Sequence, residues 1–311
     1  MSASPLRLDQ QRRLFLVVSG ISTAGSFAGI TAKGWILLHG SADPFVLALY
    51  SAALSLPSLL ISGPAGVRTD RLGCETVLVQ AQWGLLAAAA LGALSIPLLE
   101  GTAQVLLLLG STLMVGIAGA FELTARNKYC SLLVEDPKQL AGYLTSFSVV
   151  FNVGKLVGPP IGGWLVAMAG PAWALGIDAA SYLLPIASVM FLLQPRRDME
   201  QRSRGDGDAT LLKAWKDCGS TLRGVLTLTA VLCVVNFFHP GLAPLIADQV
   251  LGPDPRDLGL FTSVLAAGSI AGGIVLQRCS ARFSRRPFLT LGGFGLITAI
   301  AQLGMAGSSS V

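Results

Sequence analysis

Charged residues are scarce in this 311-residue chain. Asp, Glu, Lys and Arg together make up 13% of the sequence, whereas apolar residues make up 52% and the mean hydropathy is +0.66. A typical soluble domain carries about 25% charged residues. A water-soluble protein of this composition would expose far too much apolar surface, so the composition indicates a membrane protein.

Residues that usually catalyse reactions or bind metals are also few. His39 and His239 are the only histidines, and the chain contains neither the HExxH pattern of metalloproteases nor the GxSxG pattern of hydrolases. The five cysteines are scattered singly, at Cys74, Cys130, Cys218, Cys233 and Cys279. Such scattering predicts neither a disulfide framework nor a metal site. We therefore expect no enzyme activity, no metal and no cofactor.

Long apolar segments are abundant. A helix that spans a bilayer needs roughly 20 apolar residues. Nine windows meet that length, at residues 14–38, 45–67, 76–98, 104–127, 140–168, 172–193, 224–247, 258–277 and 288–306. The predicted fold class is therefore an all-α membrane protein.

The positive charges predict the orientation. With a cytoplasmic N-terminus, 19 of the 22 Lys and Arg residues fall in cytoplasmic segments, Arg256 alone falls outside, and Lys33 and Lys155 lie within predicted helices. Cytoplasmic loops carry an excess of Lys and Arg. We therefore expect a multi-pass protein of the cell (inner) membrane with its N-terminus in the cytoplasm. The net charge of +5 is then explained by topology and anionic lipid headgroups, so the expected partner is the lipid bilayer and not nucleic acid.

A polar segment divides the chain. Residues 194–208 read QPRRDMEQRSRGDGD, and an amphipathic stretch, ATLLKAWKDCGSTLRG, follows them. We expect residues 1–193 to form a six-helix transmembrane bundle and residues 194–223 a cytoplasmic linker with an amphipathic helix. Residues 224–311 are expected to form a second, partial bundle of three helices.

Residues 66–73, GVRTDRLG, lie between the second and third windows. The glycines Gly66 and Gly73 and the opposite charges of Asp70 and Arg71 are typical of a tight cytoplasmic turn that joins two membrane helices. We therefore predict a turn here, not a soluble catalytic loop.

The fifth window contains a second glycine-rich motif, GKLVGPPIGG. Its Gly154, Gly158 and Gly162 recur every four residues and so share one helix face, where another helix can approach closely. We expect that helix to be the eighth, which carries glycines of its own. These are Gly268, Gly272 and Gly273. Pro159 and Pro160 predict a kink, and the motif is either a packing seam alone or also part of a gate.

The motifs together resemble those of the major facilitator superfamily. The segment GVRTDRLGCE resembles the motif between helices 2 and 3 of that family, with Gly66, Asp70, Arg71 and Gly73 at its signature positions. The helix 5 run is similar to the motif of its exporters. The matching positions are Gly154, Lys155, Gly158, Pro159, Gly162 and Gly163. Residues 121–163 and 173–193 are similar to the branch that contains enterobactin and macrolide exporters, and the resemblance covers essentially the whole chain.

This resemblance implies the major facilitator fold, with a complete N-terminal six-helix bundle and three helices of the C-terminal bundle. It implies secondary active transport by alternating access, most simply export of a small organic molecule that is siderophore-like or drug-like. Protons are the candidate coupling ion. In the family, Asp70 and Arg71 would stabilise one conformation through contacts with helix 11.

Only three windows follow the linker, so we expect the chain to be truncated after helix 9. The alternative to a transporter is then a truncated, non-transporting membrane protein or a subunit of a split transporter. We expect the chain alone to transport nothing unless a second polypeptide completes it, and robust transport by the purified chain in vesicles would contradict this.

Charged residues inside the predicted helices are the candidates for coupling or substrate binding, because a charge at the bilayer centre costs at least ~2.5 kcal/mol. They are Glu122, Arg126, Lys155 and Asp178. Lys155 either faces a cavity and attracts an anionic substrate or bonds the carbonyls that the prolines free. Glu122 and Arg126, four residues apart, form a simple ion pair, or Glu122 couples protons. Asp178 and Lys33 sit at equal depth and are expected to neutralise one another.

Overall fold

The computed structural model describes residues 7–41, 43–134, 136–192, 218–236, 238–252, 254–278 and 287–308. Over these residues the chain is helical almost throughout, which confirms the all-α prediction. The chain divides into two compact units, one made of Met1–Gly205 with Ala243–Ala266 and the other of Asp206–Leu242 with Ala267–Val311. Most of the predicted linker 194–223 lies outside the described residues.

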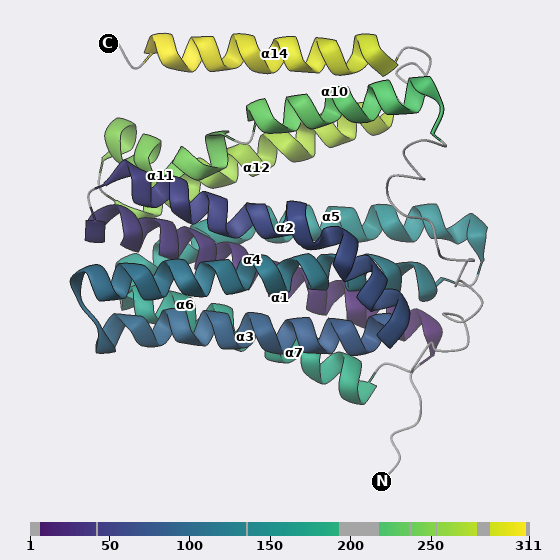
Figure 1. Cartoon of the computed structure of the whole chain (residues 1–311), viewed down its shortest axis with the longest axis horizontal. Coiled ribbons are helices and arrows are strands. Elements are labelled where there is room, and N and C mark those ends of the chain that lie inside the picture. The colour runs from purple at the N-terminus through teal and green to yellow at the C-terminus, as the bar shows by residue number, and fades with distance from the viewer. Residues whose placement is uncertain are drawn as a thin grey trace. The chain divides into compact units, whose positions relative to one another are not determined.

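The helices of the N-terminal part follow one another with very short connections (Figure 1). They are α1 (Leu8–Ser41), α2 (Pro44–Leu72), α3 (Cys74–Leu98), α4 (Gly101–Leu132), α5 (Pro137–Ala169), α6 (Pro171–Ser181) and α7 (Leu183–Ala187), followed by a π-helical turn at Ser188–Leu192. The later helices are α10 (Ser220–Asn236), α11 (Phe238–Leu251), α12 (Pro255–Arg278) and α14 (Pro287–Ser308).

Local sequence signals explain where two of these helices begin. Asp43 precedes Pro44, and its carboxylate accepts a hydrogen bond of 2.9 Å from the backbone N–H of Phe45. Asp136 does the same for Lys138 at the start of α5. An acidic cap followed by proline at the first helical position satisfies the free N–H groups and presets the backbone angle of the first turn.

The turn expected at residues 66–73 is much shorter in the structure than predicted. Gly66, Asp70 and Arg71 belong to the last two turns of α2, which ends at Leu72. Gly73 alone connects α2 to α3, with φ at 92° and its N–H bonded to the carbonyl of Thr69 at 3.0 Å. A single glycine in this left-handed region reverses the chain without a longer loop, so the helix continues through the charged residues.

Six helical segments of the described chain are long and apolar enough to cross a bilayer, and they coincide with the first six predicted windows. The seventh window, 224–247, lies within α10 and α11, and residue 237 between them lies outside the described residues. The last two windows lie within α12 and α14.

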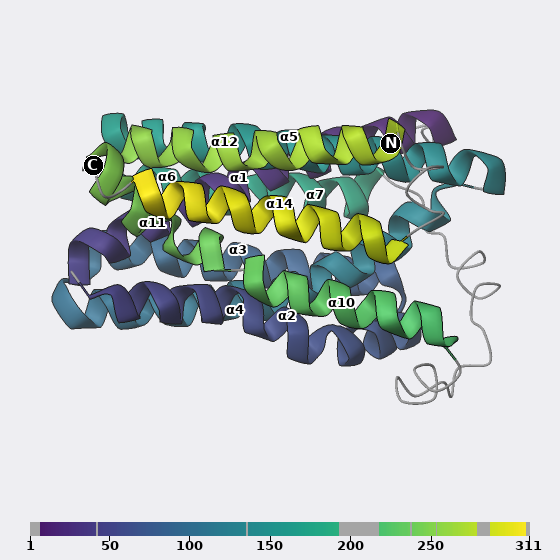
Figure 2. The same cartoon turned by 90° about the horizontal axis from the view of Figure 1, so that it is seen from above.

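In the first unit, α1 packs mainly on α5 and α6, while α4 packs on both α2 and α3 (Figures 1 and 2). Much apolar surface remains outside this packing. Leu59 of α2 is 76% exposed and Trp173 of α6 is 65% exposed. Large apolar side chains at such exposure suit contact with lipid tails and not with water.

The glycines of the helix 5 motif let α5 lie directly on α1. A Cβ atom placed on Gly158 would stand 2.5 Å from the carbonyl oxygen of Ala24 and 2.8 Å from the Cβ of Phe27. On Gly162 it would stand 2.8 Å from the Cα of Ala28. Backbone approach of this kind is open only to residues without a side chain, so these positions form a packing seam.

The predicted partner of this seam is therefore wrong. The glycines of α5 meet α1 because α1 also carries small residues at four-residue intervals, at Gly20, Ala24 and Ala28. Periodicity alone identified the face of α5 but could not choose between two helices that both offer such a face.

The first half of α12 contacts α5 at its two prolines. Proline has no N–H, so Pro160 leaves the carbonyl of Leu156 without its usual helical donor. The Ser263 hydroxyl of α12 donates to that carbonyl at 2.8 Å. Gly259, one turn earlier, fits against the backbone of Pro159 and Pro160. The sequence suggested that Lys155 could bond a carbonyl freed by the prolines. In the structure, Ser263 makes such a bond, to the carbonyl of Leu156.

Replacing Ser263 with alanine should lower stability by about 0.6–1.7 kcal/mol, because the Leu156 carbonyl would lose its donor in a water-poor setting. The matched control is Thr262→Ala, since the Thr262 hydroxyl bonds only carbonyls of its own helix. Thermal unfolding of the two purified variants gives the comparison. Equal midpoints for the two variants would show that the bond to Leu156 contributes nothing.

The sixth predicted helix is interrupted at Tyr182. Pro185 cannot donate to the carbonyl of Ser181, four residues earlier, and its ring crowds that carbonyl. The N–H of Tyr182 accordingly bonds to Ala179, three residues back, at 3.2 Å. The interruption separates α6 from α7 and places Tyr182 at the junction.

The second unit is smaller, and in it α10 packs on α14. Gly224 of α10 faces the ring of Phe288, and Gly295 of α14 faces the side chain of Leu232. Each glycine makes room for a large apolar side chain of the facing helix. Residues 279–286, which contain Arg282, Arg285 and Arg286, lie outside the described residues.

Candidate functional site

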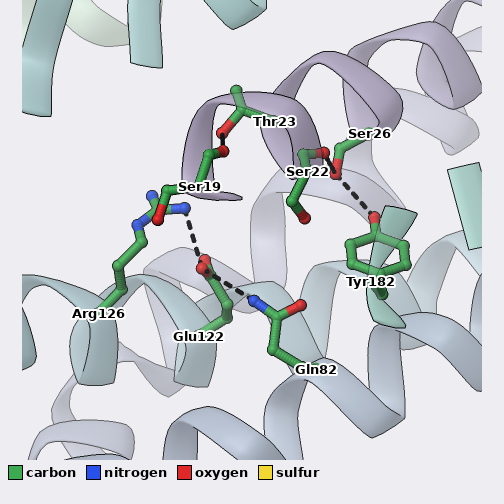
Figure 3. Close-up of polar contacts among 8 residues, drawn as sticks. All are labelled: Ser19, Ser22, Thr23, Ser26, Gln82, Glu122, Arg126 and Tyr182. Atoms are coloured by element: carbon green, nitrogen blue, oxygen red, sulfur yellow. Dashed lines mark hydrogen bonds and ion pairs between the residues drawn. The ribbon is translucent and has the colours of Figure 1, made fainter. Parts of the chain in front are cut away.

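A polar cavity of about 50 Å³ lies inside the first unit, between α1, α3, α4 and the junction of α6 and α7. Polar side chains converge on it from all of these elements (Figure 3). They are Ser19, Ser22, Thr23 and Ser26 of α1, Gln82 of α3, Glu122 and Arg126 of α4, and Tyr182. Polar groups in the interior of a membrane bundle are costly, so such a cluster marks a candidate functional site.

Glu122 and Arg126 form a buried ion pair in this cavity. The Nη1 atom of Arg126 lies 2.9 Å from Oε1 of Glu122, and the two residues are only 9% and 8% exposed. The pair forms because residues four apart face the same side of a helix. The sequence predicted this pairing. The guanidinium also lies 5.4 Å and 5.2 Å from the ring centroids of Phe147 and Phe151, contacts that favour a cation.

Gln82 extends the pair toward α3. Its amide nitrogen donates to Oε1 of Glu122 at 3.3 Å, so this carboxylate oxygen accepts from two side chains. The carbonyl oxygen of Gln82 and the Nε of Arg126 are buried without a hydrogen-bond partner among the described residues. Buried polar atoms are normally satisfied, so a water or a ligand group in the cavity has an acceptor and a donor to meet.

The wall opposite Glu122 consists of hydroxyl groups on α1. Thr23 and Ser26 donate to the carbonyls four residues earlier, at 2.7 Å and 2.9 Å, as is common for such residues in apolar helices. The Ser26 hydroxyl also lies 2.9 Å from the hydroxyl of Tyr182 (Figure 3). The spacing of Ser19, Ser22, Thr23 and Ser26 is the signal from which sequence reasoning could have found this wall.

A second, smaller cavity of about 20 Å³ lies farther along α1. It shares Ser26 and Tyr182 with the first cavity. Lys33 of α1 and Asp178 of α6 face it, and they are 3% and 4% exposed. The cavity is larger than the 10–15 Å³ or so that a water molecule requires.

Lys33 and Asp178 therefore line the same cavity. They do not form a direct ion pair with each other. The Nζ of Lys33 donates to the hydroxyl of Ser111 at 3.1 Å. The Oδ1 of Asp178 is buried without a hydrogen-bond partner among the described residues. The two charges thus approach as a pair with room for water between them, as the equal depth of the residues predicts.

Two glycines make space for these charges. A Cβ atom on Gly29 of α1 would collide with the carboxylate of Asp178, and one on Gly92 of α3 would stand 3.1 Å from the Cε of Lys33. Neither glycine belongs to a recognisable motif, so sequence reasoning did not identify them.

The other predicted site residues lie elsewhere. Asp70, at the end of α2, pairs with Lys128 of α4 at 2.8 Å. Lys155 of α5 is half-buried, with its Nζ 5.8 Å from the ring centroid of Phe27. The structure thus brings Glu122, Arg126 and Asp178 into one polar interior and leaves Lys155 outside it. No group of three His, Cys, Asp or Glu side chains suited to a metal occurs among the residues that the structure describes.

Comparison with known proteins gives consistent matches. Residues 1–311 match the family described as transmembrane secretion effectors. The multidrug efflux pump Tap of Mycolicibacterium fortuitum is 24% identical over 94% of this chain and 72% of the pump. Tap of Mycobacterium tuberculosis is 25% identical over 94% of this chain and 70% of the pump.

A solved structure shares the fold. It is the crystal structure of a bacterial homologue of the human lysosomal transporter Spinster, in an inward-facing and unoccupied conformation. The TM-score is 0.63 at 15% identity, and the match covers 88% of this chain. The chain spans 64% of the length of that structure. At this identity the likeness shows the major facilitator fold and nothing more specific.

Proposed function

We propose that this chain, which belongs to the transmembrane secretion effector family of the major facilitator superfamily, exports a small, drug-like organic molecule in exchange for protons that bind at Glu122. Membership of the family makes it a multi-pass membrane transporter. The relatives named Tap are multidrug efflux pumps, which supports export and a drug-like substrate. We place it in the cell membrane with a cytoplasmic N-terminus, because the Lys and Arg residues favour that orientation.

The observation that carries the proton coupling is the position of Glu122. Its carboxylate is buried in a polar cavity, and it is held by Arg126 and Gln82. A carboxylate in such a site has two stable states, one paired with the cation and one protonated. Protonation removes the negative charge that pairs with Arg126, so proton uptake at Glu122 can drive a conformational step of the transport cycle.

The two glycine motifs have supporting roles in this proposal. Gly154, Gly158 and Gly162 keep α5 against α1, the helix that carries the hydroxyl wall. Asp70 and Arg71, with Gly66 and Gly73, act at the end of α2 as conformational residues, and Lys128 is the partner that the structure supplies for Asp70.

The test is Glu122→Gln in membrane vesicles from the cells that produce the protein, so that any second polypeptide needed for transport is present. A pH gradient is imposed across the vesicles, and the fluorescent cation ethidium is the probe. We expect the variant to bind ethidium but to lose gradient-driven transport down to the level without a gradient, because the amide cannot take up a proton. The control is Glu100→Gln, which removes an exposed carboxylate just before α4. Gradient-driven transport by Glu122→Gln at the wild-type rate would remove Glu122 from the coupling mechanism.

A further inference from the structure

The buried polar groups of the first unit form one file along α1. The file starts at Glu122 and Arg126 in the larger cavity, passes Ser26 and Tyr182, and ends at Asp178 in the smaller cavity. From Ser19 to Lys33 the helix rises about 21 Å at 1.5 Å per residue. The hydrocarbon core of a bilayer is about 30 Å thick, so the file covers much of the distance that a proton must travel.

The two cavities meet at a pair of hydroxyl groups. Ser26 and Tyr182 line both cavities, and their oxygens are 2.9 Å apart. A hydroxyl can donate one hydrogen bond and accept others, so each of the two can receive a proton from one side and release one to the other. Both cavities have room for water beside these hydroxyls.

The charged groups around Glu122, at one end of the file, resemble those around Asp178, at the other end. Around Glu122 the titratable groups are Arg126 and Cys130 of its own helix and, across the cavity, Tyr182. Around Asp178 they are Lys33 of α1, Tyr50 of α2 and Tyr182. With both carboxylates ionised, each end holds one anion and one cation. A single added proton therefore gives the two ends together one net positive charge. Either carboxylate can accept that proton, because the two lie in similar surroundings.

We propose that Asp178 is a second proton-exchanging carboxylate, connected to Glu122 through water and the hydroxyl pair of Ser26 and Tyr182. The proton leaves the Glu122 carboxyl group, which becomes a carboxylate. Each water and hydroxyl on the way takes up one proton and gives up one, and Asp178 ends as the carboxylic acid. Arg126 and Lys33 remain cations throughout, and no electrons are transferred. The inference rests on the proposed proton uptake by Glu122.

The experiment follows the arrival of the proton at Asp178. The protein, reconstituted in lipid vesicles, is subjected to a rapid drop in pH, and the carboxyl stretching bands are recorded by time-resolved infrared spectroscopy. The band that is missing from the double variant Lys33→Met/Asp178→Asn identifies Asp178. This variant removes both charges together and so avoids leaving one of them buried alone.

We expect Tyr182→Phe to slow the rise of the Asp178 band by about 100-fold or more, since a positioned proton donor contributes factors of this size. The final amplitude should not change, because the carboxylate itself is intact. Glu122→Gln should slow the same band to a similar degree. Tyr182→Phe should still fold, because Ser26 keeps its bond to the carbonyl of Ser22. Tyr143→Phe, on α5 and outside the file, is the control and should leave the rate unchanged.

A wild-type rate in both Tyr182→Phe and Glu122→Gln would overturn the relay, as would an Asp178 band that does not respond to pH. A purely structural role for Tyr182 would instead reduce the amplitude without changing the rate, which would also contradict the proposal. The measurement needs no transported substrate. A protein that relays protons but moves no ethidium would therefore refute the proposed export and leave the relay standing.

Discussion

The Gly158→Leu variant is expected to lose most of its folded yield. A Cβ atom at this position would stand 2.5 Å from the Ala24 carbonyl, and a leucine adds three further carbons in the same direction. Excess volume in a packed interior costs about 1–3 kcal/mol when neighbouring side chains can move. Here the neighbour is helix backbone, so α1 and α5 must separate, and we expect the cost to reach or exceed the upper end of that range.

The matched control lies on the same helix. Gly142 of α5 is exposed, and a Cβ atom there would meet nothing within 4 Å, so Gly142→Leu should leave the yield near that of the wild type. Size-exclusion chromatography of the detergent-extracted protein and its thermal unfolding midpoint give both comparisons. Similar losses for the two variants would mean that the glycine seam is not the cause and that leucine is simply unfavourable in α5.

The sequence was sufficient to predict the parts of the fold that depend on composition and local pattern. Apolar windows located the first six spanning helices, because the requirement for about 20 apolar residues is imposed by the bilayer and not by tertiary contacts. The pairing of Glu122 with Arg126 was also predictable, since it depends only on helical spacing.

Features that depend on which helices meet were not predictable in the same way. The small-residue face of α5 was clear, yet its partner was α1 and not the eighth helix, because several helices present equivalent faces. Tyr182 and Gln82 were missed because a single polar residue in an apolar window has no distinguishing pattern. Their roles follow only from the arrangement of α1, α3, α4 and α6 around one cavity.

The turn at residues 66–73 shows a third kind of error. Glycines and charges were taken as evidence of a loop, but only Gly73 leaves the helix, with its φ of 92°. Asp70 and Arg71 are tolerated in the last turn of α2 because a helix end at the membrane surface is solvated. Motif residues thus fixed the position of the connection but not its length.

The largest electrostatic effect should appear when Lys33 and Asp178 are changed one at a time. Removal of one partner from a buried, directly bonded ion pair costs about 3–5 kcal/mol, because the other charge is left uncompensated. For Lys33 and Asp178, which face one cavity without a direct bond, we expect the lower end of that range. Asp178→Asn leaves Lys33, 3% exposed, with the hydroxyl of Ser111 as its remaining side-chain partner. Lys33→Met leaves the carboxylate of Asp178 facing a small cavity without its cation.

The double variant Lys33→Met/Asp178→Asn should be more stable than either single variant, since no charge remains and replacement of a buried pair by neutral groups is often neutral or stabilising. Thermal unfolding of the three purified variants measures the ordering. The control is Asp9→Asn, which removes an 83% exposed carboxylate from its 3.4 Å pair with Arg12 and should change the midpoint little. Additive losses in the double variant would show that the two charges do not compensate each other. Each charge would then be stabilised independently, for example by reaching toward the membrane surface.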